Sequence, residues 1–384
     1  MTASNDTAFG SLRAEQWTSQ WYRALQSAEV NAGVDLRAEA GQSVFSLLLA
    51  ISVAAHRGRD GLPVELRLPR EPAGLDQLRR WNFQSVCELA TGRSLRRLVA
   101  PVDHALFGTP APERPAAKVA SGVSAFIDEL ERDAFFGLTA YRLYERGALT
   151  RMIRSEWERW RHPLVARLVR PVTADIARDV ARVLVHELLA NVIQHPDATM
   201  AVVGTSVDSS PAGELRLVIA VWDDGDSVVD TLSKIPVDQL RATDADDWAA
   251  DITDEFIVDA RGWTPAATYI PANWVPPAGA QGGDLLLSAL LPGISRKHVS
   301  DDFPQVDRPE PVAWESRRGF GLHALYRSAI NAFGGTVSVR TSDFWLRLSA
   351  GEKAFQYRAD IDRVDEPLFG NLVSVELPLT PARL

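Results

Sequence analysis

The sequence predicts an α+β protein with an N-terminal mixed α/β region over residues 1–165 and a C-terminal α/β domain over residues 166–384. Three observations lead to this prediction. The chain has 384 residues, which is long for one typical domain and suggests two. Hydrophobic residues make up 46% of the chain and charged residues 24%, a composition that can form packed cores. Segments with helical periodicity also alternate with short segments of strand periodicity.

The N-terminal region combines helical patterns with one strand pattern. Apolar residues recur at helical spacing around residues 8–28, 41–56, 74–90 and 124–160. Residues 63–69 alternate between polar and apolar side chains between two prolines, which predicts a short strand. The proline-rich residues 108–115 predict a linker or an exposed loop. No motif here indicates catalysis, so we interpret the region as a regulatory, docking or dimerising unit.

The C-terminal domain begins with a long helical pattern. Thr173 can cap a helix that runs to His195, where Pro196 ends it. Two apolar segments follow, over residues 200–207 and 215–222, and each predicts a strand.

A long segment of unusual composition, residues 228–317, interrupts this domain. It contains an acidic run and a stretch rich in Pro, Gly and Ala. A structureless loop of this length is uncommon in a compact domain, so we expect short elements within it, such as residues 284–291. The pattern then predicts a helix over 321–333 and strands over 335–341 and 372–377.

Charge and cysteine content exclude several classes of protein. The net charge of −9 argues against a non-specific nucleic-acid binder, whose affinity comes mainly from Lys and Arg. The single cysteine, Cys87, excludes an internal disulfide and fits a reducing compartment. The first residues lack the pattern of a signal peptide, and the longest apolar run, residues 44–55, is shorter than the roughly 20 residues of a membrane span. We therefore expect a cytoplasmic protein without membrane contact.

The first chemical motif lies near the end of the helix that Pro196 terminates. An apolar stripe at helical spacing continues onto Glu187 and Asn191, which lie one turn apart. Two polar side chains on a core-facing stripe need partners, because each buried unpaired group costs about 1–3 kcal/mol. A bound ligand could supply such partners, and the alternative is a helix whose Glu and Asn face solvent.

Two further motifs follow at the ends of predicted elements. The strand over residues 215–222 leads into Asp223-Asp224-Gly225, which could bind a ligand or form an acidic hairpin turn. Arg318-Gly319-Phe320-Gly321-Leu322 precedes an amphipathic helix, where free N–H groups and the helix dipole favour phosphate oxygens. A Gly-x-Gly by itself is more often just a turn.

In this order and on these elements, the three motifs resemble the nucleotide-binding boxes of the GHKL ATPase superfamily, which includes gyrase, MutL, histidine kinases and anti-sigma serine kinases. The resemblance covers about residues 173–227 and 317–378. It implies a Bergerat-type α/β sandwich, with helices on one face of a mixed sheet, that binds ATP and Mg²⁺.

The resemblance also implies a role for each matching residue. Glu187 would orient or deprotonate the attacking water or hydroxyl group, and Asn191 would be a ligand of Mg²⁺. Asp223 would accept a hydrogen bond from the adenine amino group, and Gly225 would let the backbone approach the base. The remaining cofactor-binding residues, next to the phosphates, would be Arg318, Gly319, Gly321 and Leu322. The chain departs from the family at Ser227, a usual glycine, and at Asn371, where Thr is frequent.

Three functional classes remain open. Glu187 favours a phosphotransferase of the serine-kinase type, whereas His162 is the only phosphoacceptor candidate for a histidine kinase near the domain boundary. An ATPase of the gyrase or MutL type would need a following domain that donates a Lys, and the chain ends at Leu384, so an Arg or Lys297 would have to take that role. A nucleotide-gated interaction module would bind ATP and signal without turnover.

We expect a protein that hydrolyses ATP or transfers its γ-phosphate in a bacterial signalling or regulatory role. The alternative is the non-catalytic nucleotide-gated module, with signalling through the N-terminal region and residues 228–317, which lie where the family has its ATP lid. A protein partner would bind one of these two parts, and the resemblance implies a homodimer.

Overall fold

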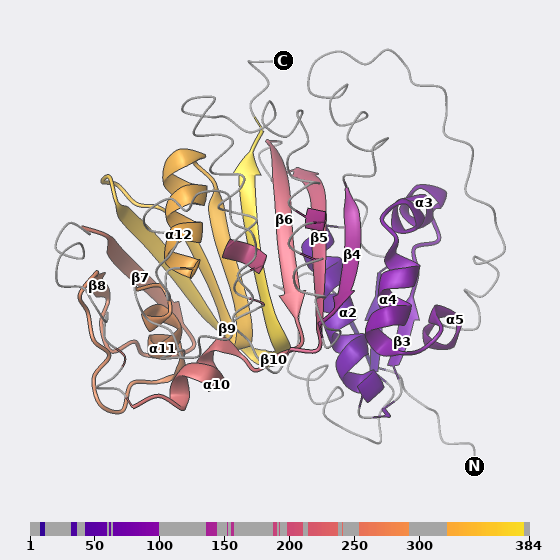
Figure 1. Cartoon of the computed structure of the whole chain (residues 1–384), viewed down its shortest axis with the longest axis horizontal. Helices are drawn as coiled ribbons and strands as arrows, with labels where there is room; N and C mark the ends of the chain where they lie inside the picture. Colours follow the sequence, from indigo (N-terminus) through magenta and orange to yellow (C-terminus); the bar gives the residue numbers. More distant parts are fainter. Residues whose placement is uncertain are drawn as a thin grey trace.

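We describe the fold from a computed structural model of the chain. The structure describes residues 8–11, 32–36, 43–59, 61–62, 64–99, 136–143, 152, 155–156, 187–189, 192, 198–209, 214–236, 240, 253–291 and 321–379. These residues form a three-stranded and a seven-stranded β-sheet with helices packed against them (Figure 1). The predicted α+β class is therefore confirmed.

The smaller sheet consists of β1 (Ala8–Ser11), β2 (Ala32–Asp35) and β3 (Val64–Arg67), paired in parallel in this order. Strand β3 confirms the strand predicted over residues 63–69. Strand β1 shows that the helix predicted over residues 8–28 is wrong at its start, and residues 12–28 lie outside the described residues. Strand formation over four residues depends on the neighbouring strand, and periodicity within the segment cannot reveal that neighbour.

Four helices accompany the smaller sheet: α2 (Val44–Arg59), α3 (Pro72–Arg80), α4 (Phe83–Thr91) and α5 (Leu95–Leu98). Helix α2 confirms the helix predicted over residues 41–56. The helix predicted over residues 74–90 is instead α3 followed by α4. The chain turns at Asn82, whose φ of 58° belongs to the left-handed region and interrupts a right-handed helix.

The larger sheet contains β4 (Gly137–Arg142), β5 (Met200–Ser209), β6 (Leu215–Asp223), β7 (Glu255–Arg261), β8 (Tyr269–Pro271), β9 (Thr336–Ala350) and β10 (Gln356–Pro378). Its order is β4-β5-β6-β10-β7-β8, with β9 also paired to β10. The β10–β7 pair is parallel and the other pairs are antiparallel, so the sheet is mixed. The four strands predicted in the C-terminal domain are confirmed as parts of β5, β6, β9 and β10.

Strand β4 corrects the helical prediction over residues 124–160. Gly137 has a φ of 125°, which an α-helix does not allow, and the following residues pair with β5. Met152, Ser155 and Glu156 are helical, as predicted. Because β4 belongs to residues 1–165 and β5 to residues 166–384, the predicted domain boundary falls between two paired strands of one sheet.

Helices cover both faces of the larger sheet. Helix α2 packs on one face, where Phe45 stacks on Trp345 with ring centroids 6.2 Å apart. The neighbouring Phe344 points to the other face and contacts Trp263 and Gly282, at the start of α11 (Gly282–Ser288). The resemblance implied helices on one face, and α2 departs from that arrangement.

The α11 side of the sheet also carries α10 (Val228–Ser233) and α12 (Gly321–Arg327), which continues as a π-helix over Ser328–Ala332. In Figure 1 these helices lie at the β7–β9 end of the sheet, whereas α3, α4 and α5 lie beside β4. Helix α12 and its extension confirm the helix predicted over residues 321–333.

The described part of residues 228–317 contains α10, β7, β8 and α11. Short elements were expected there, and α11 overlaps the predicted residues 284–291. Of the helix predicted from Thr173 to His195, Glu187–Leu189 and Val192 are described and helical, and residues 108–115 lie outside the described part. No helix among the described residues is long and apolar enough to cross a membrane.

Candidate functional site

Three polar side chains meet at the C-terminal end of β6. Asp223 is in register with Asn371 of β10, and Asn371 is in register with Thr341 of β9. We call these three residues the Asp223 cluster. Each is buried, with 3%, 1% and 0% of its surface exposed for Asp223, Asn371 and Thr341. Residues in register on neighbouring strands share a face, so the cluster lies on one face of the sheet.

Hydrogen bonds connect the cluster to the turn that follows β6. The Asn371 side-chain amide donates to Asp223 Oδ1 at 3.2 Å and to the Asp226 carbonyl oxygen at 2.9 Å. The Thr341 hydroxyl donates to Asn371 Oδ1 at 2.7 Å. The backbone N–H of Val228 donates to both Thr341 Oγ1 and Asn371 Oδ1. Asn371 therefore uses its amide and its carbonyl oxygen to hold the turn against the sheet.

The two oxygens of Asp223 have different surroundings. Oδ1 accepts hydrogen bonds from the Gly225 N–H at 3.0 Å and from Asn371, whereas no described residue donates to Oδ2. Burial raises the pKa of this carboxyl group to about 7, although the two hydrogen bonds oppose the shift. A donor placed at Oδ2 would favour the ionised form. The site can therefore recognise an N–H group.

The backbone at Gly370 packs closely against the backbone of Asp223. Gly370 has a φ of 84°, and a side chain there would collide with the backbone carbonyl of Asp223. The register between β9 and β10 shifts between Arg363 and Leu368 and again between Leu368 and Asn371. Such irregularities bend a strand and are frequent beside active sites. The Asp223 cluster thus begins where β10 resumes regular pairing.

Two other residues of this turn, Asp224 and Ser227, have structural roles. Asp224 accepts hydrogen bonds from the backbone N–H groups of Thr199 and Met200 at 2.7 and 2.8 Å, which fixes the start of β5. Ser227 caps α10 by accepting from the N–H of Asp230 at 2.9 Å. Ser-x-x-Asp resembles a capping box, so the sequence held a signal for this cap.

The other predicted site residues are only partly described. Glu187 is buried, with 8% of its surface exposed, in a helical segment whose next residue, Leu188, is also buried. Gly321 begins α12, and Leu322 packs half-buried against the core. Asn191, Arg318 and Gly319 lie outside the described residues. Of the predicted site, the surroundings of Asp223 and Gly225 are therefore described, and the roles assigned at the base, the phosphates and the metal all stay predictions.

A second buried polar cluster joins β7 to α12. The Tyr326 hydroxyl contacts Asp254 Oδ2 at 3.1 Å and His323 Nδ1 at 2.8 Å, and Arg327 lies 3.5 Å from the same carboxylate oxygen. Burial lowers the pKa of His323 to about 3, so this histidine is neutral at pH 7. Asp254 Oδ1 is buried without a hydrogen-bond partner. These contacts tie the segment over residues 228–317 to the helix that follows the third motif.

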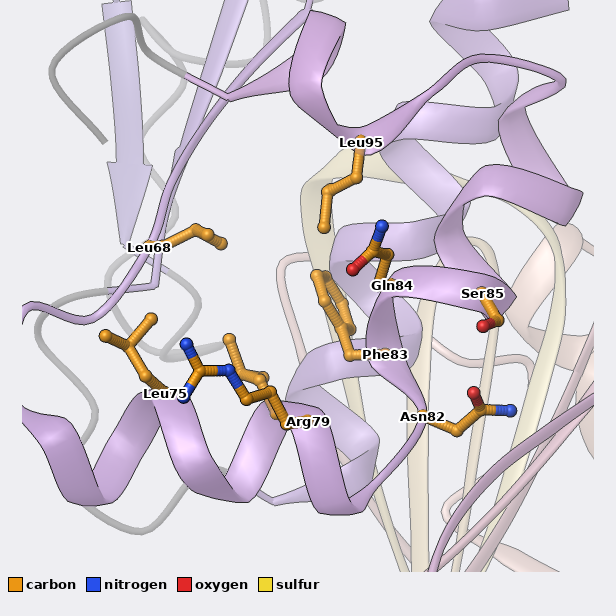
Figure 2. A pocket seen from close by; sticks show the side chains of 9 residues that line it. Leu68, Leu75, Arg79, Asn82, Phe83, Gln84, Ser85 and Leu95 are labelled. Atoms are coloured by element: carbon orange, nitrogen blue, oxygen red, sulfur yellow. The ribbon is translucent and has the colours of Figure 1, made fainter. Parts of the chain in front are cut away.

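A separate cavity of about 200 Å³ lies among α3, α4, α5 and the end of β3. Leu68 and Leu75 line one side and Phe83 and Leu95 another, with Arg79 at its edge (Figure 2). It shares no residue with the Asp223 cluster. Elsewhere in the described part of the chain, no group of three or more His, Cys, Asp or Glu side chains is arranged to hold a metal.

Comparisons of the chain with protein-family models, with curated proteins and with solved structures gave no match.

Proposed function

We propose that the protein binds ATP and Mg²⁺ at a GHKL-type (Bergerat) site and hydrolyses ATP or transfers its γ-phosphate in a bacterial signalling or regulatory role. One observation carries the proposal: Asp223 is buried, and its Oδ2 accepts no hydrogen bond from a described residue. An ionised carboxylate only accepts hydrogen bonds, so Oδ2 is free to take one from a ligand. The amino group of adenine is such a donor.

The surroundings of Asp223 support selectivity for adenine. Gly225 and Asn371 bind Oδ1 and so fix the orientation of the carboxylate. Guanine and hypoxanthine carry a carbonyl oxygen where adenine carries its amino group. Above pH 7, where Asp223 is mostly ionised, that oxygen would face the carboxylate, and two acceptors without a proton between them repel each other.

The roles at the phosphates follow from the resemblance. Asn191 would hold Mg²⁺, and Arg318, Gly319, Gly321 and Leu322 would lie beside the triphosphate. Mg²⁺ neutralises charge on the phosphate oxygens when it is bound. Glu187 would orient or deprotonate the attacking water or hydroxyl group, which is the basis for proposing turnover.

Nucleotide titration tests the base site. ATP with Mg²⁺ should raise the melting temperature, because saturation at 100 times Kd adds about 2.7 kcal/mol of stability. Inosine triphosphate, which lacks the amino group, should bind more weakly. The Asp223→Asn variant should lower ATP affinity by about tenfold, comparable to the loss of one hydrogen bond to a charged group. Equal affinity of the variant and the wild type would rule out this role for Asp223.

Phosphate release tests the proposed turnover on the same samples. Glu187→Ala should still bind ATP and lose release of phosphate, whereas Asn191→Ala should lose Mg²⁺-dependent binding. Unchanged turnover in Glu187→Ala would show that another residue activates the attacking group.

The second proposed function is a nucleotide-gated interaction module. The contacts of α12 with Asp254 favour it, because they connect residues 228–317 to the phosphate side of the predicted site. A protein partner would bind these residues or the N-terminal region, and a homodimer is the family expectation. ATP-dependent stabilisation without phosphate release would favour this module over an enzyme.

A further inference from the structure

One side of helix α2 contacts the two segments that carry Asp223 and Asn371. The contacts come from Ser52, His56 and Arg59, which are four and three residues apart and therefore lie on one side of the helix. Helix α2 belongs to the N-terminal region, for which the sequence indicated no chemistry.

The first two contacts hold Phe369, two residues before Asn371. The Ser52 hydroxyl donates to the Phe369 carbonyl oxygen at 3.1 Å, and the same oxygen accepts from the Trp222 indole N–H at 2.9 Å. The His56 ring stacks on the Phe369 ring with an angle of 9° between their planes. Both the backbone and the side chain of Phe369 are thus fixed by α2.

The third contact holds the turn after β6. Arg59 forms an ion pair with Asp224 at 3.2 Å, and Asp224 directly follows Asp223. Gly370, next to Phe369, lies against the Asp223 backbone carbonyl with no room for a side chain. A displacement of Phe369 therefore moves Gly370 against the residue that would recognise the base.

Helix α2 lies on the opposite face of the sheet from the Asp223 cluster. Val44 and Leu48 of α2 face Gly204, which is in register with Ala220 and Ser374. Asp223 lies three residues from Ala220 on β6, and Asn371 lies three residues from Ser374 on β10. Successive side chains of a strand point to opposite faces, so those of Asp223 and Asn371 point to the other face. Helix α2 can act on the cluster only through the strands, as a positioning element.

We propose that Ser52, His56 and Arg59 position the base site, so that the N-terminal region sets its affinity and selectivity for the nucleotide base. This inference rests on the proposed ATP-binding function. A change in the N-terminal region that shifts α2 alters the geometry of Asp223 without touching the nucleotide.

Binding measurements on α2 variants test the inference. His56→Ala and Ser52→Ala should each weaken ATP binding by about fivefold, the effect expected for one lost contact of about 1 kcal/mol. The preference for ATP over inosine triphosphate should fall in parallel. Binding of inorganic tripolyphosphate with Mg²⁺, which has no base, should stay the same. His56→Phe keeps a ring on Phe369 and should restore ATP affinity.

Ser46→Ala is the matched control, because Ser46 is a partly exposed serine of the same helix away from the three contacts. Equal losses for ATP and tripolyphosphate in His56→Ala would overturn the inference, since they would indicate general damage to the fold. Failure of His56→Phe to restore binding, or unchanged ATP affinity in both alanine variants, would also overturn it.

A measurement without nucleotide separates this inference from the proposed function. The carboxyl pKa of Asp223 can be followed by NMR of carbon-labelled aspartate, with Asp223→Asn to assign the signal. His56→Ala should move this pKa towards its ordinary value, because a loosened Phe369–Asn371 segment admits water. If the wild type binds no ATP, the proposed function fails, and an unchanged Asp223 pKa in His56→Ala would then reject the positioning role as well.

Discussion

Asp223 is buried and is held by donors on only one carboxylate oxygen, and its burial is the main cause of its response to pH. Its pKa rises from 3.8 to about 7 because burial disfavours the charge more than the bonds from Gly225 and Asn371 favour it. At neutral pH Asp223 is therefore present both as a neutral carboxylic acid, which donates and accepts hydrogen bonds, and as an ionised carboxylate, which only accepts them. The ionised form is the one that an amino group would select.

A stability profile against pH should reveal this residue. Between about pH 4 and 7 the unfolded chain has lost the Asp223 proton and the folded chain keeps it, so stability falls as pH rises through this range. Above pH 7 the penalty is constant and on the order of 4 kcal/mol, the free energy that corresponds to a rise of the pKa from 3.8 to about 7. Asp223→Asn should gain stability relative to the wild type over the same range, as measured by urea unfolding at each pH. Parallel profiles for the two proteins would contradict the raised pKa.

Gly370 is the second residue whose replacement has a defined consequence. Gly370→Ala should destabilise the protein by more than the roughly 1–3 kcal/mol that a left-handed backbone costs a residue with a side chain, because the new Cβ also meets Asp223. Gly279→Ala is a matched control, since Gly279 has the same φ of 84° and open space around it. In thermal unfolding, Gly370→Ala should have a much lower melting temperature than Gly279→Ala. Similar losses would show that no close contact with Asp223 exists.

At the scale of elements, the second buried polar cluster, which joins Asp254 to His323, Tyr326 and Arg327, connects α12 to β7 and so links the third motif to residues 228–317. Three groups face Asp254 Oδ2, namely the Tyr326 hydroxyl, the His323 ring and the Arg327 guanidinium. Because Oδ1 of the same carboxylate has no partner, the cluster depends on the contacts to Oδ2. Removal of one donor leaves a buried charge with less compensation.

Tyr326→Phe should therefore lower the free energy of unfolding by about 1–3 kcal/mol, the cost of an unsatisfied buried group. Tyr269→Phe makes the same chemical change at a tyrosine that is 46% exposed and should have little effect. Denaturant unfolding of both variants gives the comparison. If Tyr326→Phe is as stable as Tyr269→Phe, the hydroxyl does not support Asp254.

At the scale of the whole molecule, the N-terminal and C-terminal regions share one sheet and one core. Strand β4 pairs with β5, and α2 covers the face of the sheet opposite α10, α11 and α12. A fragment of residues 166–384 would lack both elements and expose apolar surface of β5 and β6. Exposed apolar area is unfavourable by about 25 cal/mol per Å².

We expect the fragment of residues 166–384 to bind a hydrophobic dye and to lack a cooperative thermal transition. A fragment of residues 43–384 keeps α2 and β4 and should still unfold cooperatively, at a lower temperature than the full chain because it lacks β1 and β2. Calorimetry and dye fluorescence on the two fragments make the comparison. A cooperative transition in the shorter fragment would show that residues 166–384 fold without the N-terminal region.

Much of the fold could be predicted from local patterns. Helix α2 and strands β3, β5 and β6 follow from apolar periodicity, because each buries a continuous set of its own side chains. The helix break at Asn82 and the strands β1 and β4 could not be predicted this way. The break depends on one left-handed residue, and the two strands depend on distant partners.

The sequence by itself determined that Asp223 ends an apolar strand two residues before a glycine. This local pattern left a hairpin turn open, and the resemblance of the three motifs together made Asp223 a candidate base-binding residue. Only the tertiary structure decided which residues surround it. Thr341 and Asn371 join Asp223 through strand register, and α2 reaches the same segments from the opposite face. The hydrogen bonds from Asn371 to Asp223 and from Val228 to Thr341 link residues more than 100 positions apart. Such pairings arise from packing of the whole core, which no local pattern encodes.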